Sequence, residues 1–321
     1  MKCLVTGANG FVGAHLVRHL LNTGHEVRAV VSTEQTGTAN ANGVEYARVA
    51  RSEVDATAWQ AACRDVDVIF HLAGRAHHGD AFSPAARAVY FRDNWEMTRA
   101  LTQAAITEQV RRFVFSSSVT VYGVASVAAQ PLREDTSAQP HPDDVFAQSK
   151  LAAEKFLLSN EIRAALEPVI VRLPLVYGAG VKGNMAMLIK LTQSGLPLPL
   201  AGIDNRRSFV NIPNCVDFLL TAATYPDATG KILLTSDGED VSTPDLLRAI
   251  AHASGKSVRL FSVPLGLLKA ACILLGKKAY YEKLAGNFQI DSSASCKLLG
   301  WSPKVSFTDG IAQMCAEDKS A

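Results

Sequence analysis

The sequence predicts an α/β protein built on a doubly wound parallel sheet. A short apolar run with a β-branched bias opens the chain at residues 2–6, and three glycines follow it at regular spacing. Apolar runs of strand length then alternate with amphipathic helical patterns as far as about residue 175. Strands that alternate with helices across short turns favour right-handed crossovers and a parallel sheet.

The glycine turn after the first strand indicates a dinucleotide site of the Rossmann type. Gly7 permits a tight turn, Gly10 lets a pyrophosphate approach the backbone, and Gly13 lets the next helix pack against the strand. The N-terminus of that helix favours anions through its free N–H groups and its dipole. A glycine-rich turn without a ligand is the alternative. The residues expected to bind the cofactor here are Gly7, Asn9, Gly10, Phe11, Val12 and Gly13.

Two domains are expected, with the boundary near residue 175. Residues 1–175 are predicted as the dinucleotide-binding domain, and residues 176–321 as a smaller, mostly helical substrate domain. Part of the segment 206–235, including a strand at 231–235, is expected to return to the sheet. The other strands are expected at 26–31, 44–49, 66–71, 112–116 and 168–172. Helices are expected at 56–63, 91–108, 146–158, 243–253, 264–275 and 292–299.

Composition narrows the classes of function. The chain has 321 residues and a net charge of +2, which does not suggest nucleic acid or an anionic membrane as a partner. Its six cysteines are scattered without metal-binding spacing, and no signal peptide is evident, so a cytoplasmic protein without a metal is expected. The most apolar stretch, 263–276, is too short to span a bilayer. A packed helix is expected there, with membrane contact as the alternative.

The end of the second strand bears on which cofactor binds. A carboxylate at this point would bond the ribose hydroxyls of NAD, but the strand ends in Ser32 and Thr33. The absence of an acid favours NADP over NAD. Ser32 and Thr33 would donate to the extra phosphate, and Arg28 or Arg51 would supply charge. The alternative is that Ser32 and Thr33 are polar turn residues.

Further motifs stand in order along nearly the whole chain. They are TGANGFVG at 6–13, HLAG at 71–74, Asn94, SSSVTVYG at 116–123, Ser149-Lys150, RLPLVYG at 172–178, RSFV at 207–210 and LGWSP at 299–303. In this combination the chain resembles the extended short-chain dehydrogenase/reductases, in their NAD-dependent epimerase/dehydratase branch. Four motifs in the second half, GVKGN at 180–184, LPLPL at 196–200, NRRS at 205–208 and SDGE at 236–239, are similar to a bacterial surface-polysaccharide subgroup. Its members are identified both as UDP-glucose 4-epimerases and as reductases of UDP-4-keto-6-deoxy-N-acetylhexosamine.

The resemblance implies hydride transfer at C4 of a UDP-hexose. An epimerase of this kind keeps its NAD, whereas a ketoreductase consumes NADPH. A homodimer through the helices at 91–108 and 146–158 is also implied. Further cofactor contacts are implied for Leu72, Ala73, Gly74, Asn94, Ser116, Lys150 and Leu173, and Arg51 stands where the family often has an Asp. Substrate contacts are implied for Ser118, Tyr122, Asn184, Leu198, Arg206 and Arg207.

The catalytic set implied by the resemblance lacks its tyrosine. In the family, a Tyr-x-x-x-Lys pair and a serine act on the substrate oxygen. Lys150 and Ser118 match the lysine and the serine, with Thr120 as a candidate helper, but Phe146 stands at the tyrosine position. Phenylalanine has no hydroxyl and cannot be a general acid or base.

Three explanations for this departure stay open. The phenylalanine is an introduced substitution that keeps the shape of the ring, or Tyr122 serves in its place, or the protein binds nucleotides without turnover. A reductase of a non-sugar carbonyl is a further alternative, although the Arg206-Arg207 pair favours a phosphorylated substrate.

Overall fold

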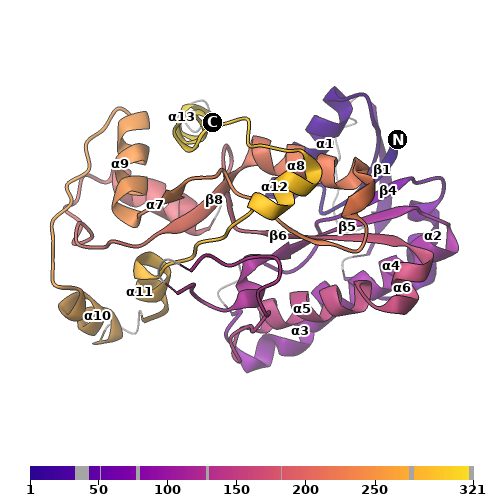
Figure 1. The fold of residues 1–321 in the computed structure, drawn as a ribbon, viewed down its shortest axis with the longest axis horizontal. Coiled ribbons are helices and arrows are strands. Elements are labelled where there is room, and N and C mark those ends of the chain that lie inside the picture. The colour runs from indigo at the N-terminus through magenta and orange to yellow at the C-terminus, as the bar shows by residue number, and fades with distance from the viewer. Residues whose placement is uncertain are drawn as a thin grey trace.

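The computed structural model describes residues 1–32, 43–50, 52–76, 80–127, 130–181, 183–274 and 278–317, without the side chains of 184, 278–280 and 283. Figure 1 shows two unequal parts, a large parallel sheet flanked by helices and a smaller part near α7, α9 and α13.

The predicted doubly wound sheet is confirmed, with seven parallel strands in the order β3-β2-β1-β4-β5-β6-β9. The chain moves outward from β1 to β3 and then outward in the other direction from β4. The order therefore reverses between β1 and β4, and ligands of such sheets bind at the carboxyl ends of the strands at this point. The strands are β1 (Lys2–Thr6), β2 (Glu26–Ser32), β3 (Val44–Val49), β4 (Val68–His71), β5 (Arg112–Ser118), β6 (Glu167–Leu173) and β9 (Ile232–Leu234).

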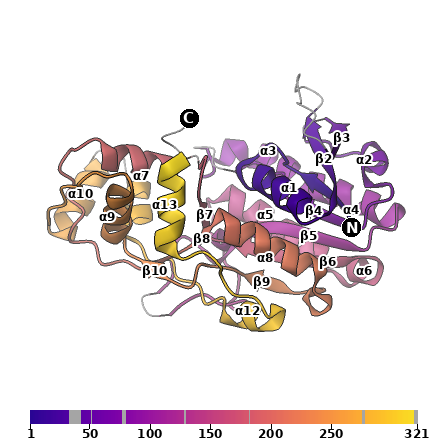
Figure 2. The ribbon, with the colours of Figure 1, turned by 90° about the horizontal axis from the view of Figure 1, so that it is seen from above.

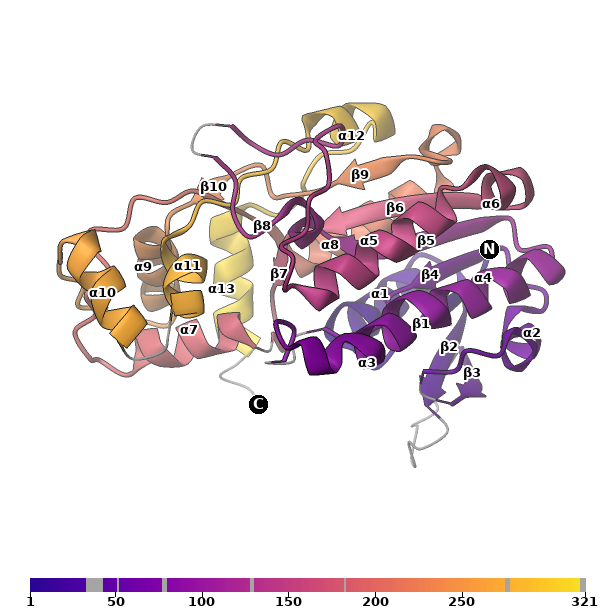
Figure 3. The same cartoon turned by 90° about the horizontal axis from the view of Figure 1, so that it is seen from below.

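Helices cover both faces of this sheet (Figures 2 and 3). Each face buries its own apolar cluster, one including Leu16 and Phe218 and the other including Trp59 and Leu101. On the first face lie α1 (Phe11–Asn22), α8 (Ile212–Thr224) and α12 (Ser293–Leu299). On the second lie α2 (Ala56–Cys63), α4 (Met97–Thr107), α5 (Val145–Leu157) and α6 (Asn160–Ala165).

The expected return of the segment 206–235 to the large sheet is right for one strand and wrong for another. Strand β9 pairs with β6, in register from Ile170 with Ile232. Strand β8 (Arg207–Asn211) instead lies in a separate three-stranded sheet with β7 (Leu175–Tyr177) and β10 (Asp240–Val241). Helices α7 (Asn184–Gln193), α9 (Thr243–Ala253) and α13 (Phe307–Glu317) share a core with this small sheet.

Helix α8 is an element that the sequence pattern did not predict. Its second residue is Pro213, which reads as a break in a helical pattern. In the structure this proline lies in the first turn, where the missing N–H has no intrahelical partner in any case. The helix packs on α1 and on the sheet, although it follows the boundary expected at residue 175. Helices α7, α11 (Lys278–Ala285) and α13 were likewise not predicted.

The apolar stretch at 263–276 does not pack as expected. It forms helix α10 (Leu265–Leu274), but none of its ten residues is buried. The helix lies at the end of the smaller part that is farthest from the large sheet (Figures 1 and 3). Within the described ranges, no helix is both long enough and apolar enough to cross a membrane.

Hydrogen bonds from the guanidinium of Arg112 link the C-terminal end of α8 to the large sheet. Arg112 belongs to β5 and is only 2% exposed. Its Nη1 donates to the carbonyl oxygens of Ala223 and Tyr225 at 3.0 and 2.5 Å, and its Nη2 donates to the Glu167 carboxylate at 2.6 Å. The last carbonyl groups of a helix have no intrahelical partner, so a cation placed there stabilises the helix end.

We predict that Arg112→Met lowers the free energy of unfolding by about 3 kcal/mol, because it leaves Glu167 and the helix carbonyls without their partner. Urea unfolding followed by circular dichroism measures the loss. The control is Arg248→Met, whose ion pair with Asp245 is exposed on both sides and should cost below ~1 kcal/mol. Equal losses in the two variants would contradict the role given to Arg112.

Candidate functional site

The glycine turn brings three backbone segments into contact at the switch point of the sheet. Gly7 has a φ of +68°, and a Cβ on it would lie 2.8 Å from the Ala73 nitrogen in the loop after β4. A Cβ on Gly13 would lie 2.1 Å from the Gly7 carbonyl oxygen. Only glycine fits either position. Helix α1 begins after Gly10, and no side chain of the described residues caps it. Its first N–H groups therefore remain for a ligand, and the turn fits a dinucleotide pyrophosphate.

The buried imidazole of His71 links β1 to α4 through hydrogen bonds. His71 ends β4 and is fully buried. Its Nδ1 lies 2.7 Å from Thr6 Oγ1, and its Nε2 lies 2.9 Å from Thr98 Oγ1. Since Thr98 donates its own proton to the Asn94 carbonyl and Thr6 accepts from the Ala73 N–H, the imidazole donates from Nε2 and accepts at Nδ1. Burial, and next to it the Lys150 charge, lowers the pKa of His71 to about 3.

The Asn94 side chain extends this hydrogen-bond network to α5, the helix that contains Ser149. Its Oδ1 accepts from the Arg75 N–H at 2.7 Å, and its Nδ2 donates to Ser149 Oγ at 2.9 Å. Ser149 in turn donates to the Phe146 carbonyl at 2.7 Å. Asn94 lies in a wide π turn, Arg92–Glu96, between α3 (Arg87–Phe91) and α4. Such turns are often found at functional sites, and the sequence, which predicts one continuous helix over 91–108, gave no sign of this one.

Lys150 is buried beside these loops. Its Nζ donates to the Ser116 carbonyl at 2.9 Å and lies 4.5 Å from the centre of the Phe115 ring. A Cβ on Gly74 would lie 3.3 Å from the same Nζ, so Gly74 leaves the ammonium room. The side chain is 5% exposed. Burial lowers the pKa of Lys150 to about 8, while the Glu154 charge acts in the opposite direction.

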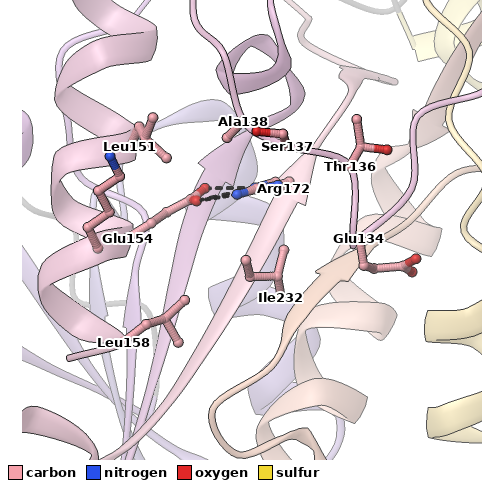
Figure 4. Close-up of a pocket in the computed structure, with 10 residues that line it drawn as sticks. Glu134, Thr136, Ser137, Ala138, Leu151, Glu154, Leu158, Arg172 and Ile232 are labelled. Carbon is pink, nitrogen blue, oxygen red and sulfur yellow. Dashed lines mark hydrogen bonds and ion pairs between the residues drawn. The ribbon is translucent and has the colours of Figure 1, made fainter. Parts of the chain in front are cut away.

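An ion pair that the sequence pattern did not predict holds the helix of Lys150 against the sheet. Glu154, one turn after Lys150 in α5, accepts from Arg172 Nε at 3.0 Å and from Nη2 at 2.6 Å. Both side chains are buried. The pair borders a hollow of 530 Å³ between α5, β6, β9 and residues 134–138 (Figure 4). The signal in the sequence was the spacing of Lys150 and Glu154, which puts both on neighbouring turns of one helix.

Ser118 ends β5 with its hydroxyl held in one orientation. Its Oγ accepts from the Thr120 N–H at 3.2 Å and from the Thr120 hydroxyl at 2.9 Å. Both bonds are accepted, so the Ser118 proton remains to be donated. The expected helper role of Thr120 is compatible with this geometry. Ser116, on the same strand, donates from Oγ to the His71 carbonyl at 3.2 Å.

Phe146 is half-buried in the first turn of α5. Its ring meets the buried ring of Tyr90 edge-on, with the centroids 6.4 Å apart. The Tyr90 hydroxyl donates to Asp80 at 3.1 Å, and burial raises the pKa of Tyr90 to about 12. Asp144 caps the helix by accepting from the Ala147 N–H.

Tyr122 does not fit the role of a substitute acid. Its hydroxyl donates to the Arg133 carbonyl at 2.6 Å, and the Arg172 guanidinium lies 4.5 Å from its ring centre. Burial raises the pKa of Tyr122. This geometry does not favour Tyr122 as a replacement for the missing hydroxyl, and that role stays a prediction. Its ring packs in a small cluster with Val121 and Phe288.

Residues expected at the adenosine end are only partly described. Ser32 ends β2 and is half-buried, whereas Thr33 and Arg51 lie outside the described residues. Arg28 is corrected as a source of charge for a phosphate. Its guanidinium donates to the Ala62 and Arg64 carbonyls at 2.8 and 2.6 Å and pairs with Glu45. Leu72 and Leu173 pack in the cluster on the α1 face.

Apart from Ser118 and Tyr122, which lie at and just after the end of β5, the expected substrate residues belong to the smaller part. Leu198 is buried in its core and bonds through its backbone to Arg259 and Phe261. Arg207 begins β8, with Nη1 donating to the Gly286 carbonyl at 3.2 Å, and burial lowers its pKa. Arg206 is exposed. The side chain of Asn184 is not among those that the structure describes. In the part of the chain that is described, no group of three or more His, Cys, Asp or Glu could hold a metal.

Comparison with known proteins decides the family. The sequence profile of the NAD dependent epimerase/dehydratase family matches residues 3–234. The chain belongs to this family. A UDP-glucose 4-epimerase of Vibrio cholerae is 34% identical over 97% of this chain and 93% of its own length. A 3 beta-hydroxysteroid dehydrogenase/Delta 5-->4-isomerase of Mycobacterium tuberculosis is 27% identical over 79% of this chain and 70% of its own.

Solved structures share the fold of this chain over its full length. The Thermus thermophilus UDP-glucose 4-epimerase in complex with NAD has a TM-score of 0.78 at 24% identity, with 100% of both chains covered. MoeE5 in complex with UDP-glucose and NAD has a TM-score of 0.76 at 23% identity, covering 100% of this chain and 99% of its own. The two-part architecture is thus that of the epimerase/dehydratase family.

The buried imidazole gives a testable prediction. A lowered pKa means that the unfolded chain binds a proton at His71 below about pH 6.5, while the folded chain does not until about pH 3. Stability from this group is present above pH 6.5 and is lost as the pH falls toward 3. In the folded protein, nitrogen NMR should show His71 neutral, with the proton on Nε2, from pH 5 to pH 8. The signals that are absent from the spectrum of His71→Gln identify those of His71 in the native spectrum. A titration midpoint near 6.5 for these signals would contradict the network.

Proposed function

We propose that this member of the epimerase/dehydratase family is a NAD(P)-dependent oxidoreductase acting at C4 of a UDP-hexose, as a 4-epimerase or as a 4-keto-sugar reductase. The observation that carries the proposal is the position of Lys150. It lies one turn after Phe146, buried beside Gly74 and Asn94 and next to the strand that ends at Ser118. The Vibrio cholerae relative named a UDP-glucose 4-epimerase supports the substrate class.

The described residues fit a nicotinamide dinucleotide. The uncapped start of α1 would take the pyrophosphate, and the loop Leu72–Gly74 would flank the cofactor on the β4 side. The buried Lys150 ammonium would bond the nicotinamide ribose. The bound nicotinamide would supply the hydride acceptor and donor. The absence of an acid at the end of β2 supports NADP over NAD.

On the substrate side, Ser118 would donate its free proton to the C4 oxygen, since both of its present bonds are accepted from Thr120. The proton that leaves or joins this oxygen needs an acid–base group at position 146, and Phe146 offers none. Arg206 and Arg207 would bind the diphosphate, for which a guanidinium fork is suited. The chain thus holds the orienting groups of the reaction and lacks the proton-transfer group.

We predict that Phe146→Tyr raises turnover by ~10²–10⁴-fold, because it restores one positioned acid–base group. Each form is given NADPH with a UDP-4-ketohexose and followed by nicotinamide absorbance. In a parallel assay with NAD+ or NADP+, inversion of UDP-glucose at C4 is followed by NMR. The responding assay distinguishes reductase from epimerase. Lys150→Met added to Phe146→Tyr should abolish the gain. Equal turnover by the Phe and Tyr forms would show that the catalytic set is wrong.

We predict that NADPH binding weakens above pH 8. Burial lowers the pKa of Lys150 to about 8, so the ammonium is present below that pH and is lost as the pH rises through it. Loss of one charge-assisted hydrogen bond, about 1.5 kcal/mol, corresponds to roughly tenfold in affinity. Fluorescence titration of the native chain between pH 7 and pH 9.5 measures the change. Lys150→Met should bind weakly and show no such pH dependence, and an identical profile in both would contradict the proposal.

A second candidate is a protein that binds the cofactor and a nucleotide sugar without turnover, and Phe146 is the observation that favours it. Its sign would be saturable binding of NADPH and of UDP by a native chain that is inactive in both assays. If Phe146→Tyr were inactive as well while still binding both ligands, this candidate would replace the oxidoreductase.

A further inference from the structure

Helix α10 exposes apolar side chains that the proposed chemistry does not use. Of the eleven large apolar residues exposed in the described part of the chain, five fall within residues 261–274. They are Phe261, Leu265, Leu267, Ile273 and Leu274. Leu274 is 87% exposed and Leu267 is 65% exposed. Water-exposed apolar side chains gathered in this way indicate a surface that is covered by something else.

The two most exposed of these side chains, Leu267 and Leu274, lie on the outer face of the helix. At 100° per residue, Leu267 and Leu274 lie two turns apart on one side of α10, with Ala270 and Ala271 between them. Leu268 and Cys272 are half-buried on the inner side, where Leu268 packs against the core of the smaller part. The helix therefore has an inner edge that fixes it to the protein and an outer apolar face that the described chain leaves uncovered.

The sequence around this helix is rich in positive charge, and the nearest acid along the chain is Glu282 in α11, which contacts α10. Between Asp245 and Glu282 the sequence has no acid, but it has six cations: Arg248, Lys256, Arg259, Lys269, Lys277 and Lys278. Of these, Lys256, Arg259 and Lys269 are exposed in the structure. The net charge of the whole chain is only +2, so the excess of positive charge is local. An exposed apolar helix face flanked by basic residues is complementary to an anionic lipid surface.

A second copy of the chain fits this face poorly. A two-fold contact would place the same cation-rich, acid-free segment against itself. The homodimer expected of the family would use α4 and α5, which lie on the large sheet and away from α10 (Figure 3). Spanning the bilayer is excluded for α10, because ten residues of helix cover about 15 Å of its roughly 30 Å.

We propose that α10 is a membrane-surface anchor, which lays its outer apolar face into the interface of an anionic bilayer while Lys256, Arg259 and Lys269 meet the lipid head groups. The chain would lie on the membrane rather than pass through it. This places the smaller part, with its expected substrate residues, at the bilayer surface.

Flotation with vesicles tests the anchor. The full chain is mixed with vesicles of phosphatidylcholine, or of phosphatidylcholine with roughly one third phosphatidylglycerol, at ~0.1 M and ~0.5 M salt. The native chain should float with the anionic vesicles at the lower salt, and much less with the neutral ones or at the higher salt. Leu274→Glu should weaken binding by about tenfold or more, because a carboxylate enters neither the apolar region nor the anionic surface.

The matched control is Val54→Glu. It adds the same charge at an exposed apolar residue just before α2, in the part of the molecule that contains the large sheet. It should float like the native chain. NADPH binding by Leu274→Glu at the native level shows that this variant is folded. Three outcomes would overturn the anchor: no flotation of the native chain with anionic vesicles, equal flotation of Leu274→Glu, or a native oligomer in solution that Leu274→Glu dissociates.

Discussion

The hydrogen bonds of the His71 imidazole join the two strands of the switch point to α4, the helix that carries Thr98. Thr6, which also accepts from the Ala73 N–H, bonds one side of the ring, and Thr98 bonds the other. Fully buried polar groups persist only where each donor and acceptor is matched, so the neutral ring admits one arrangement of its neighbours. The loop after β4 is held by this network, and Gly7 touches the same loop through the backbone.

The same network reaches α5, the helix that carries Phe146 and Lys150. Asn94 connects the Arg75 backbone to Ser149, and Ser149 bonds the Phe146 carbonyl. On its other side, α5 is held by the Glu154–Arg172 pair. The placement of residue 146 therefore depends on the hydrogen bond to its backbone carbonyl and on the contacts of α5. It does not depend on a hydroxyl on its own side chain. A site of this kind keeps its geometry when the ring loses its oxygen, which is why Phe146 and an intact Lys150 environment are physically compatible.

The large sheet and the smaller part of the molecule differ in how completely they bury their apolar side chains. The large sheet buries an apolar cluster on each face, and Arg112 satisfies the end of α8 inside it. In the smaller part, α9 buries residues such as Leu247 and Ile250, whereas its neighbour α10 buries none. An apolar helix that is left in water costs free energy, so its exposure is tolerated where a surface other than the protein covers it. The positive charge around α10 indicates which surface that is.

The sequence by itself determined the parallel sheet and the glycine turn, because strand and helix periods and glycine spacing are local properties of the chain. It also indicated that Phe146 lacks an acid–base group, since that follows from side-chain chemistry alone. Only the tertiary structure decided that β8 leaves the large sheet, that Arg28 turns to the Ala62 and Arg64 carbonyls, and that α10 stays exposed. It alone joined His71 to Thr98 and Asn94. These facts depend on which surfaces meet across long separations in the chain, and a local pattern carries no record of its distant partner.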